Sequence, residues 1–201
     1  MHFPGSKLRI VRVCNIILVG FRCTGKTTVG RYLGKRLRME FVDSDELIEL
    51  RARQNIREIF EKKGETWFRG QEADILAELG HRDNLVIATG GGCVLRYKTI
   101  RELKRNGRVV LLEADPETLH RRIKEDPRTS TTRPALTTMS LYEEIISQLE
   151  LRRPYYEQAS EIKISTVSRP IDDIAEEVIT RLGLKATMNA PDPRKHPEND
   201  P

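Results

Sequence analysis

The stretch NIILVGFRCTGKTTVGRYLGKRL, residues 15–37, carries the strongest structural signal in the chain. Aliphatic residues run without polar alternation into Gly20, which is typical of a strand buried on both faces. A helical repeat of apolar residues follows between Lys26 and Arg38. Between the two lies the spacing G-x-x-x-x-G-K-[ST], the Walker A pattern. The stretch therefore predicts a strand, a phosphate-binding loop and a helix in succession.

Each residue type in this loop has a physical reason to be there. Gly20 and Gly25 let the backbone wrap closely around phosphate oxygens, and successive N–H groups with the helix N-terminus form an anion site. Lys26 supplies positive charge to the outer phosphates, and the hydroxyl of Thr27 is a ligand for Mg²⁺. The bland alternative is a glycine-rich turn with a surface lysine, and the position between strand and helix argues against it. We expect the nucleotide to be held by Gly20, Cys23, Thr24, Gly25, Lys26, Thr27 and Thr28.

Composition excludes several classes of protein. The 201 residues suit one domain, and 38% hydrophobic with 5% aromatic residues implies an aliphatic core. No run approaches the roughly 18 apolar residues that span a bilayer. Residues 1–13 lack the apolar core and cleavage site of a signal peptide. We expect a cytoplasmic protein with no membrane contact.

The net charge of +5 is concentrated at the N-terminus. Residues 1–14 hold three basic and no acidic residues, which leaves +2 for the remainder, and so weak a field argues against nucleic acid as a partner. Cys14, Cys23 and Cys93 are odd in number and widely spaced. We therefore expect free thiols, without a disulfide framework or a zinc site.

Strand and helix patterns alternate along the whole chain. Further strands are expected at MEFV (39–42), NLVIATGGG (84–92), RVVLLEA (108–114) and EIKIST (161–166). This alternation predicts βαβ units and a parallel sheet with helices on both faces. Ligands of such sheets bind beyond the carboxyl ends of the strands. The segments VDSD and TGGG both follow a strand, so both are expected at this edge.

Capping residues and glycines mark the helix boundaries. Ser44 is the expected N-cap of the helix SDELIELRARQ, and Asp115 caps another. The segment SLYE at 140–143 is a capping box. Residues 55–64 and 65–80 predict two helices, each stopped by a glycine.

We expect three segments in the chain. Residues 1–14 form a basic N-terminal extension, residues 15–186 form the domain, and residues 187–201 form a disordered tail rich in proline and charge. Residues of about 125–138 lack periodicity and contain much Thr, Ser and Pro, which predicts a long loop that acts as a lid.

Carboxylates and a guanidinium supply the first candidates for chemistry. Asp43 and Asp45 lie on the same side of a strand end, where they could hold Mg²⁺ and orient or deprotonate a hydroxyl, or simply cap a helix. Glu72 falls in an apolar stripe with Phe68, so it needs a partner, and Arg69 can supply one. The pair either presents its guanidinium to a substrate or is a structural ion pair.

Three further arginines are candidates, each with a structural alternative. Arg133, which precedes Pro134, is either a mobile cation that lies over bound phosphates or a solvated arginine of the loop. Arg152 and Arg153 suit bidentate binding of a carboxylate, or cations favoured at a helix C-terminus. The glycine triplet permits a ligand to approach the backbone or forms a tight turn; its members are Gly90, Gly91 and Gly92.

Together, the segments GFRCTGKTTVG, FVDSD, FRGQE, TGGG, TRPAL and RRPYY resemble the shikimate kinases, a family of the nucleoside monophosphate kinase-like P-loop group. The resemblance covers residues 15 to about 184. It implies an α/β three-layer P-loop kinase fold, with a five-stranded parallel sheet, helices on both faces and a mobile lid. It also implies transfer of the γ-phosphate of ATP, with Mg²⁺, to the 3-hydroxyl of shikimate, on the pathway to chorismate and aromatic amino acids. Another hydroxy-acid kinase, such as a gluconate kinase, and a non-catalytic ATP-sensing module remain open.

The resemblance assigns roles by position. It implies that Asp45 meets the substrate hydroxyl, that Asp43 supports Mg²⁺ through water, and that Arg69 binds the substrate carboxylate in a site ordered by Glu72. The register of R-x-P-x-Y selects Arg152 for that carboxylate. Gly91 is the implied substrate contact within the triplet Gly90, Gly91 and Gly92.

Around the nucleotide, the resemblance makes Arg133 the lid arginine, with Lys26 and Asp45 as the other catalytic residues. Arg122 and Arg169 are further candidates for nucleotide binding. Cys23 stands where the family usually has glycine. Since positive φ is costly for cysteine, the loop either keeps Cys23 in an ordinary conformation or offsets the strain. We expect the protein to act as a monomer.

Overall fold

A computed structural model describes residues 15–126 and 140–184. The predicted extension and tail therefore lie outside the described residues. So do most of the predicted lid and its arginine, Arg133.

A parallel sheet forms the centre of the molecule. Its strands are β1 (Asn15–Val19), β2 (Glu40–Asp43), β3 (Leu85–Ala88), β4 (Gly107–Glu113) and β5 (Ile162–Ser165). They are ordered β2-β3-β1-β4-β5, and all four pairings are parallel. In the middle strand, Leu18 pairs with Ala88 on one side and Val110 on the other. Every residue of β1 is buried, which explains why its sequence is continuously apolar rather than alternating.

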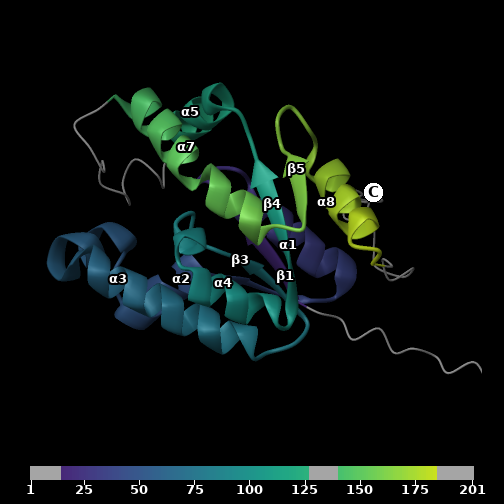
Figure 1. The fold of residues 1–201 in the computed structure, drawn as a ribbon, viewed down its shortest axis with the longest axis horizontal. Coiled ribbons are helices and arrows are strands. Elements are labelled where there is room, and N and C mark those ends of the chain that lie inside the picture. The colour runs from purple at the N-terminus through teal and green to yellow at the C-terminus, as the bar shows by residue number, and fades with distance from the viewer. Residues whose placement is uncertain (1–14, 127–139, 185–201) are drawn as a thin grey trace, which may run out of the picture.

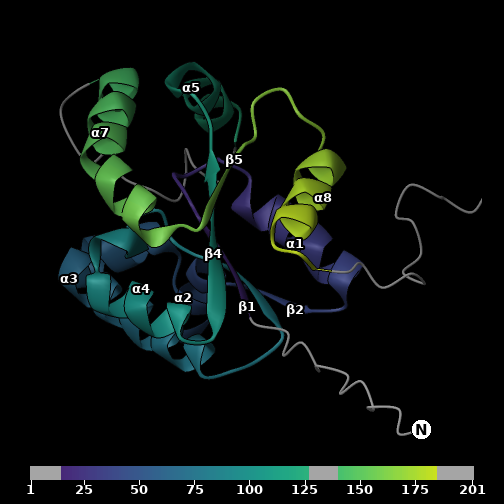
Figure 2. The ribbon, with the colours of Figure 1, turned by 45° about the vertical axis from the view of Figure 1, so that its right-hand side comes forward.

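Helices cover both faces of this sheet. They are α1 (Lys26–Leu37), α2 (Ser44–Ala52), α3 (Ile56–Gly80), α4 (Tyr97–Lys104), α5 (Pro116–Glu125), α7 (Leu141–Ala159) and α8 (Ile171–Arg181), with a 3₁₀ turn, η1 (Cys93–Leu95). Figures 1 and 2 show α1 and α8 on one face and α2, α3 and α4 on the other. Separate apolar clusters fill the two interfaces. The predicted three-layer α/β fold is confirmed.

Helices α5 and α7 lie beyond the carboxyl end of β4 (Figure 1). A third apolar cluster joins them to the loop after β1, through buried Phe21, Leu119 and Ile145. This cluster places α7 over the edge where the sequence predicts ligands to bind. None of the helices in the described parts of the chain is long and apolar enough to cross a membrane.

Most of the predicted helix signals are present, with two corrections. Arg152 and Arg153 do not lie at a helix C-terminus, because α7 continues through Pro154 to Ala159. Asp43, not Ser44, caps α2: its carboxylate accepts the N–H of Asp45 at 3.0 Å. The prediction was one residue late because β2 runs directly into the cap. Ser140 forms the predicted capping box of α7. The predicted break at Gly64 is also present, since its φ of 79° and ψ of 168° interrupt α3.

Candidate active site

The loop after β1 lies against the end of β4. At Gly20, a Cβ would come within 2.2 Å of the carbonyl oxygen of Leu112, and φ is 146°, so only glycine fits. Gly25 also has positive φ, 93°, where the chain turns into α1. The ammonium group of Lys26 donates to the carbonyl oxygens of Gly20 and Phe21, at 3.0 and 2.7 Å. The backbone thus holds the lysine charge over the loop.

An open pocket extends along this loop and the start of α1. Its lining includes the loop residues Cys23, Thr24, Gly25, Lys26, Thr27 and Thr28, together with Asp43, Asp45, Arg122 and Arg169. Arg122 donates to the carbonyl oxygen of Cys23 at 3.2 Å and to Thr166. Arg169 forms an ion pair with Glu177 at 2.6 Å. Among the described residues, the structure therefore brings together every predicted nucleotide contact except Gly20. Gly20 instead lies against the backbone of Leu112 in β4.

Two oxygen-bearing side chains that could bind a cation lie together in the lining of this pocket. The hydroxyl of Thr27 donates to Oδ2 of Asp43 at 2.8 Å. Burial, together with the neighbouring Asp45 carboxylate, raises the pKa of Asp43 above its ordinary value. These two effects outweigh the hydrogen bonds from Thr27 and from the N–H of Asp45, so a nearby cation would stabilise the charged form of Asp43. The described residues contain no cluster of three or more His, Cys, Asp or Glu side chains that could hold a metal by themselves. The hydroxyl of Thr27 and the carboxylate of Asp43 together suit Mg²⁺, which takes few protein ligands and keeps several waters.

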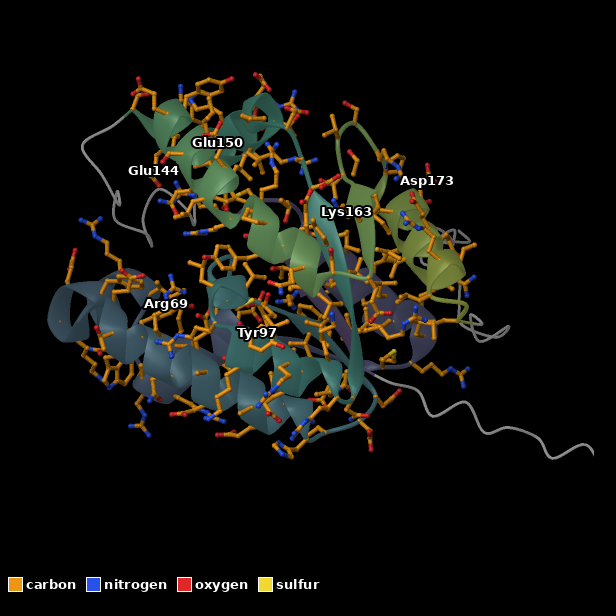
Figure 3. All side chains as sticks on the ribbon, in the orientation of Figure 1. Arg69, Tyr97, Glu144, Glu150, Lys163 and Asp173 are labelled. Carbon is orange, nitrogen blue, oxygen red and sulfur yellow. The ribbon has the colours of Figure 1, made fainter. Side chains whose placement is uncertain are left out.

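A second pocket adjoins the first. Its lining is Phe21, Arg22, Asp45, Ile56, Phe60, Phe68, Arg69, Glu72, Gly90, Gly91, Gly92, Glu144, Gln148 and Arg152. Four residues line both pockets and form the shared wall: Arg22, Asp45, Ile56 and Gly91. We call this second space the acceptor pocket. Figure 3 shows Arg69 on α3 and Glu144 on α7, the two helices that flank it.

A buried ion pair organises one side of the acceptor pocket. Glu72 is 1% exposed, and its Oε2 accepts a hydrogen bond from Arg69 at 2.9 Å. A Cβ on Gly90 would lie 2.3 Å from Oε1 of Glu72 and 2.9 Å from Oδ1 of Asp45. A Cβ on Gly92 would lie 2.8 Å from the guanidinium of Arg69. The glycines are therefore needed to make room for three charged groups.

Helix α7 contributes the opposite wall. Arg152 donates to the carbonyl oxygen of Gly91 at 3.2 Å and to Oε1 of Gln148 at 2.7 Å, both neutral acceptors. Tyr156 donates to the same carbonyl at 2.6 Å, and burial raises the pKa of this phenol. Arg153 instead lines a separate groove beside β4 and β5. The structure thus places Arg152, and not Arg153, in the acceptor pocket.

Comparison with known proteins identifies the family. The family model for shikimate kinase matches residues 22–183. A shikimate kinase of Symbiobacterium thermophilum is 40% identical over 168 residues, covering 84% of this chain and 95% of that protein. The chain belongs to the shikimate kinase family. The resemblance drawn from six short motifs is therefore confirmed.

Solved structures agree with this assignment. Shikimate kinase from Acinetobacter baumannii, solved in complex with shikimate, superposes with a TM-score of 0.79 at 36% identity, covering 85% of this chain and 93% of that one. Shikimate kinase from Aquifex aeolicus superposes with a TM-score of 0.71 at 34% identity, covering 84% of this chain and 96% of that one. A gluconokinase from Sinorhizobium meliloti superposes with a TM-score of 0.52 at 17% identity, covering 85% of this chain and 92% of that one. This likeness shows a shared fold alone.

Against the usual pattern of the shikimate kinases, Cys23 replaces a glycine of the loop. Its φ is 60°, so of the two possibilities the loop keeps the left-handed conformation and the cysteine is strained. The thiol is half-buried and donates to the carboxylate of Asp126 at 3.8 Å. Packing around Cys23 offsets part of the cost, since it contacts the apolar cluster under α7.

Sequence reasoning missed three polar residues of the acceptor pocket: Arg22, Glu144 and Gln148. Glu144 and Gln148 lie eight and four residues before Arg152, on one face of α7. That spacing was a usable signal once Arg152 had been chosen. Arg22 lies inside the Walker loop, at a position that the motif leaves unspecified.

The strain at Cys23 predicts that Cys23→Gly stabilises the protein. A left-handed residue with a side chain costs about 1–2 kcal/mol, and a glycine loses about 0.5–1 kcal/mol more backbone entropy on folding. We expect a net gain in the free energy of unfolding of about 0.5–1 kcal/mol, measured by urea titration. Gly183→Ala is the matched control, because Gly183 has φ 65° and open space around it. That change should destabilise by a similar amount. A loss in Cys23→Gly would show that packing of the thiol outweighs the strain.

Proposed function

We propose that this chain transfers the γ-phosphate of ATP to the 3-hydroxyl of shikimate, giving shikimate 3-phosphate and ADP. One observation carries the proposal: Asp45, Arg69 and Arg152 line a pocket that shares a wall with the phosphate-binding loop. Membership of the shikimate kinase family supports it. A ring acid with hydroxyl groups presents both features that this pocket matches.

The acceptor acid is held through its carboxylate. Among the described residues, the hydrogen-bond acceptors of Arg152 are all neutral, so its charge is available to an incoming anion. Arg69 is held in place by Glu72 and Glu65, at 2.9 and 3.2 Å. Its orientation is thereby fixed before the substrate arrives. The two arginines bind the carboxylate, and the glycine triplet lets the ring approach the backbone.

Asp45 orients the acceptor hydroxyl and takes its proton. The hydroxyl oxygen forms a bond to the γ-phosphorus, while the bond between that phosphorus and the β–γ bridging oxygen breaks and ADP leaves. Lys26 and the loop N–H groups stabilise the charge on the phosphate oxygens. We also propose Arg133 as the lid arginine, although it lies outside the described residues. All these groups come from one chain, so the proposal requires only a monomer.

Thr27 and Asp43, which line the nucleotide pocket, would hold Mg²⁺. When bound, the ion neutralises charge on the β- and γ-phosphates. The raised pKa of Asp43 supports this role, since a cation would relieve its poorly compensated charge. Arg122 and Arg169 would bind the remainder of the nucleotide, as both line this pocket.

The alternatives are less well supported. A gluconate kinase shares the fold, but the solved gluconokinase is only 17% identical. A non-catalytic ATP sensor has no use for an acceptor pocket that brings Asp45, Arg69 and Arg152 together.

A coupled assay of ADP release distinguishes these functions directly. The full chain is supplied with ATP–Mg²⁺ and, in parallel, with shikimate, gluconate or no acid. The proposal expects turnover with shikimate and little with gluconate. Faster turnover with gluconate would establish the other kinase, and binding of ATP without turnover of any acid would favour the sensor.

The position of Arg152 gives a sharper prediction, with Arg153 as its matched control. Arg152→Met should weaken shikimate by roughly 2–4 kcal/mol, because a charged carboxylate partner is lost. This corresponds to about 30-fold or more in KM for shikimate, with a much smaller change in KM for ATP. Arg153→Met should leave both values close to wild type. Greater sensitivity at Arg153 would show that the wrong arginine has been assigned.

Asp43→Asn separates two roles of one side chain. Asparagine caps a helix about as well as aspartate, so α2 stays capped. The raised pKa means that the folded protein binds this proton more tightly than the unfolded chain, so wild-type stability falls as pH rises through the folded-state pKa. Without nucleotide, the variant should therefore be more stable than wild type near pH 7, and the difference should shrink toward about pH 4.

In the same variant, turnover should fall and should require more Mg²⁺. Urea titrations at the two pH values and a Mg²⁺ titration of ADP release measure these effects. An unchanged Mg²⁺ requirement would remove Asp43 from the metal site.

A further inference from the structure

A buried ion pair joins the two pockets. Arg22 belongs to the loop after β1, and Glu144 lies near the start of α7. Their side chains meet at 2.9 Å and are 12% and 3% exposed. They are 122 residues apart in sequence. By contrast, the pair between Arg51 and Glu78 leaves its side chains 43% and 57% exposed.

Arg22 lies on the boundary between nucleotide and acceptor. It lines both pockets, and its backbone nitrogen would be 3.5 Å from a Cβ on Gly91. The neighbouring Phe21 is contacted by two guanidinium groups, with Arg22 at 5.8 Å and Arg152 at 5.7 Å from its ring centroid. The loop thus contacts α7 through an ion pair and an aromatic ring.

Glu144 is linked to the proposed acid-binding group along one face of α7. Glu144, Gln148 and Arg152 follow at intervals of four residues, and all three line the acceptor pocket. Gln148 accepts a hydrogen bond from Arg152 at 2.7 Å. Figure 3 shows Glu144 on α7, across the acceptor pocket from Arg69 on α3. A shift of Glu144 therefore moves the helix that carries Arg152.

Burial makes this link stiff. When one partner of a buried ion pair is removed, the other is left with a poorly solvated, uncompensated charge. The loop and α7 are therefore favoured to keep one relative position. A nucleotide that orders the loop also orders Arg22, and through Glu144 it fixes α7.

We infer that Arg22 and Glu144 are positioning residues that couple nucleotide binding in the loop to acid binding by Arg152. The inference rests on the proposed function, because it takes shikimate as the acid. Coupling of this kind is reciprocal: the factor by which nucleotide tightens the acid equals the factor by which the acid tightens nucleotide.

The test measures the dissociation constant of shikimate with and without saturating ADP–Mg²⁺. Trp67, the single tryptophan, lies on α3 beside Phe68 of the acceptor pocket and supplies a fluorescence signal. We expect ADP–Mg²⁺ to tighten shikimate about fivefold or more in the wild type, the lower end of typical coupling. In Glu144→Gln and in Arg22→Met, ADP–Mg²⁺ should lower the dissociation constant of shikimate less than about twofold. If the two residues had a purely structural role, shikimate would bind more weakly both with and without ADP–Mg²⁺, and the ratio of the two dissociation constants would be unchanged.

Glu150→Gln is the matched control on α7, because Glu150 is exposed and lies outside the acceptor pocket. It should keep the wild-type ratio. The double variant Arg22→Met with Glu144→Gln should lose no more coupling than either single variant, because each single substitution already breaks the same ion pair. Glu144→Gln preserves side-chain shape, so it decides the question by itself if Arg22→Met does not fold.

A wild-type ratio near one, or an unchanged ratio in Glu144→Gln, would overturn the inference. Either result is distinguishable from failure of the proposed function. If the wild type turns over shikimate while the ratio is unaffected, only the coupling is wrong. If it turns over no shikimate, the proposed function fails first.

Discussion

The carboxylate of Glu72 has to be compensated inside the protein, and this requirement arranges the acceptor pocket. Glu72 is 1% exposed, so its charge depends on Arg69 rather than on water. The pair holds a guanidinium at the pocket wall. The absence of a side chain at Gly90 gives Glu72 and Asp45 their space. Three positive and three negative side chains line the pocket, and two of its arginines are matched to buried glutamates. Arg152, held by neutral acceptors, carries the charge left for a substrate.

The parallel sheet brings this pocket to the phosphate-binding loop. The segments that follow β1, β2 and β3 emerge at the same edge, because the carboxyl ends of parallel strands lie together. They supply the Walker loop, the Asp43 and Asp45 pair and the glycine triplet. Helix α7 then closes the opposite side and contacts the loop through Glu144. The nucleotide and acceptor pockets thus share a wall.

Much of this arrangement could be predicted from the sequence, because its signals are local. The strand, glycines and lysine of the Walker loop are contiguous. The position of Glu72 within an apolar stripe indicated that it needs a partner, which Arg69 could supply. The register of RRPYY distinguished Arg152 from Arg153, and the structure places Arg152 in the pocket. Contacts between distant segments were not predictable. Arg22 and Glu144 meet only when α7 packs on the loop: the spacing before Arg152 could mark the face of α7 that carries Glu144, but nothing local indicates that its partner is Arg22. The conformation of Cys23 stayed open because its φ is imposed by the loop around it.

The reaction product provides the most direct test. Phosphorus NMR of a mixture of the full chain, ATP–Mg²⁺ and shikimate distinguishes transfer to the acid from hydrolysis. The account predicts a phosphomonoester resonance coupled to the proton on carbon 3 of the shikimate ring, growing in equal measure with ADP. Inorganic phosphate formed in place of the ester, or a phosphate on another hydroxyl, would contradict the geometry assigned to Asp45 and the two arginines.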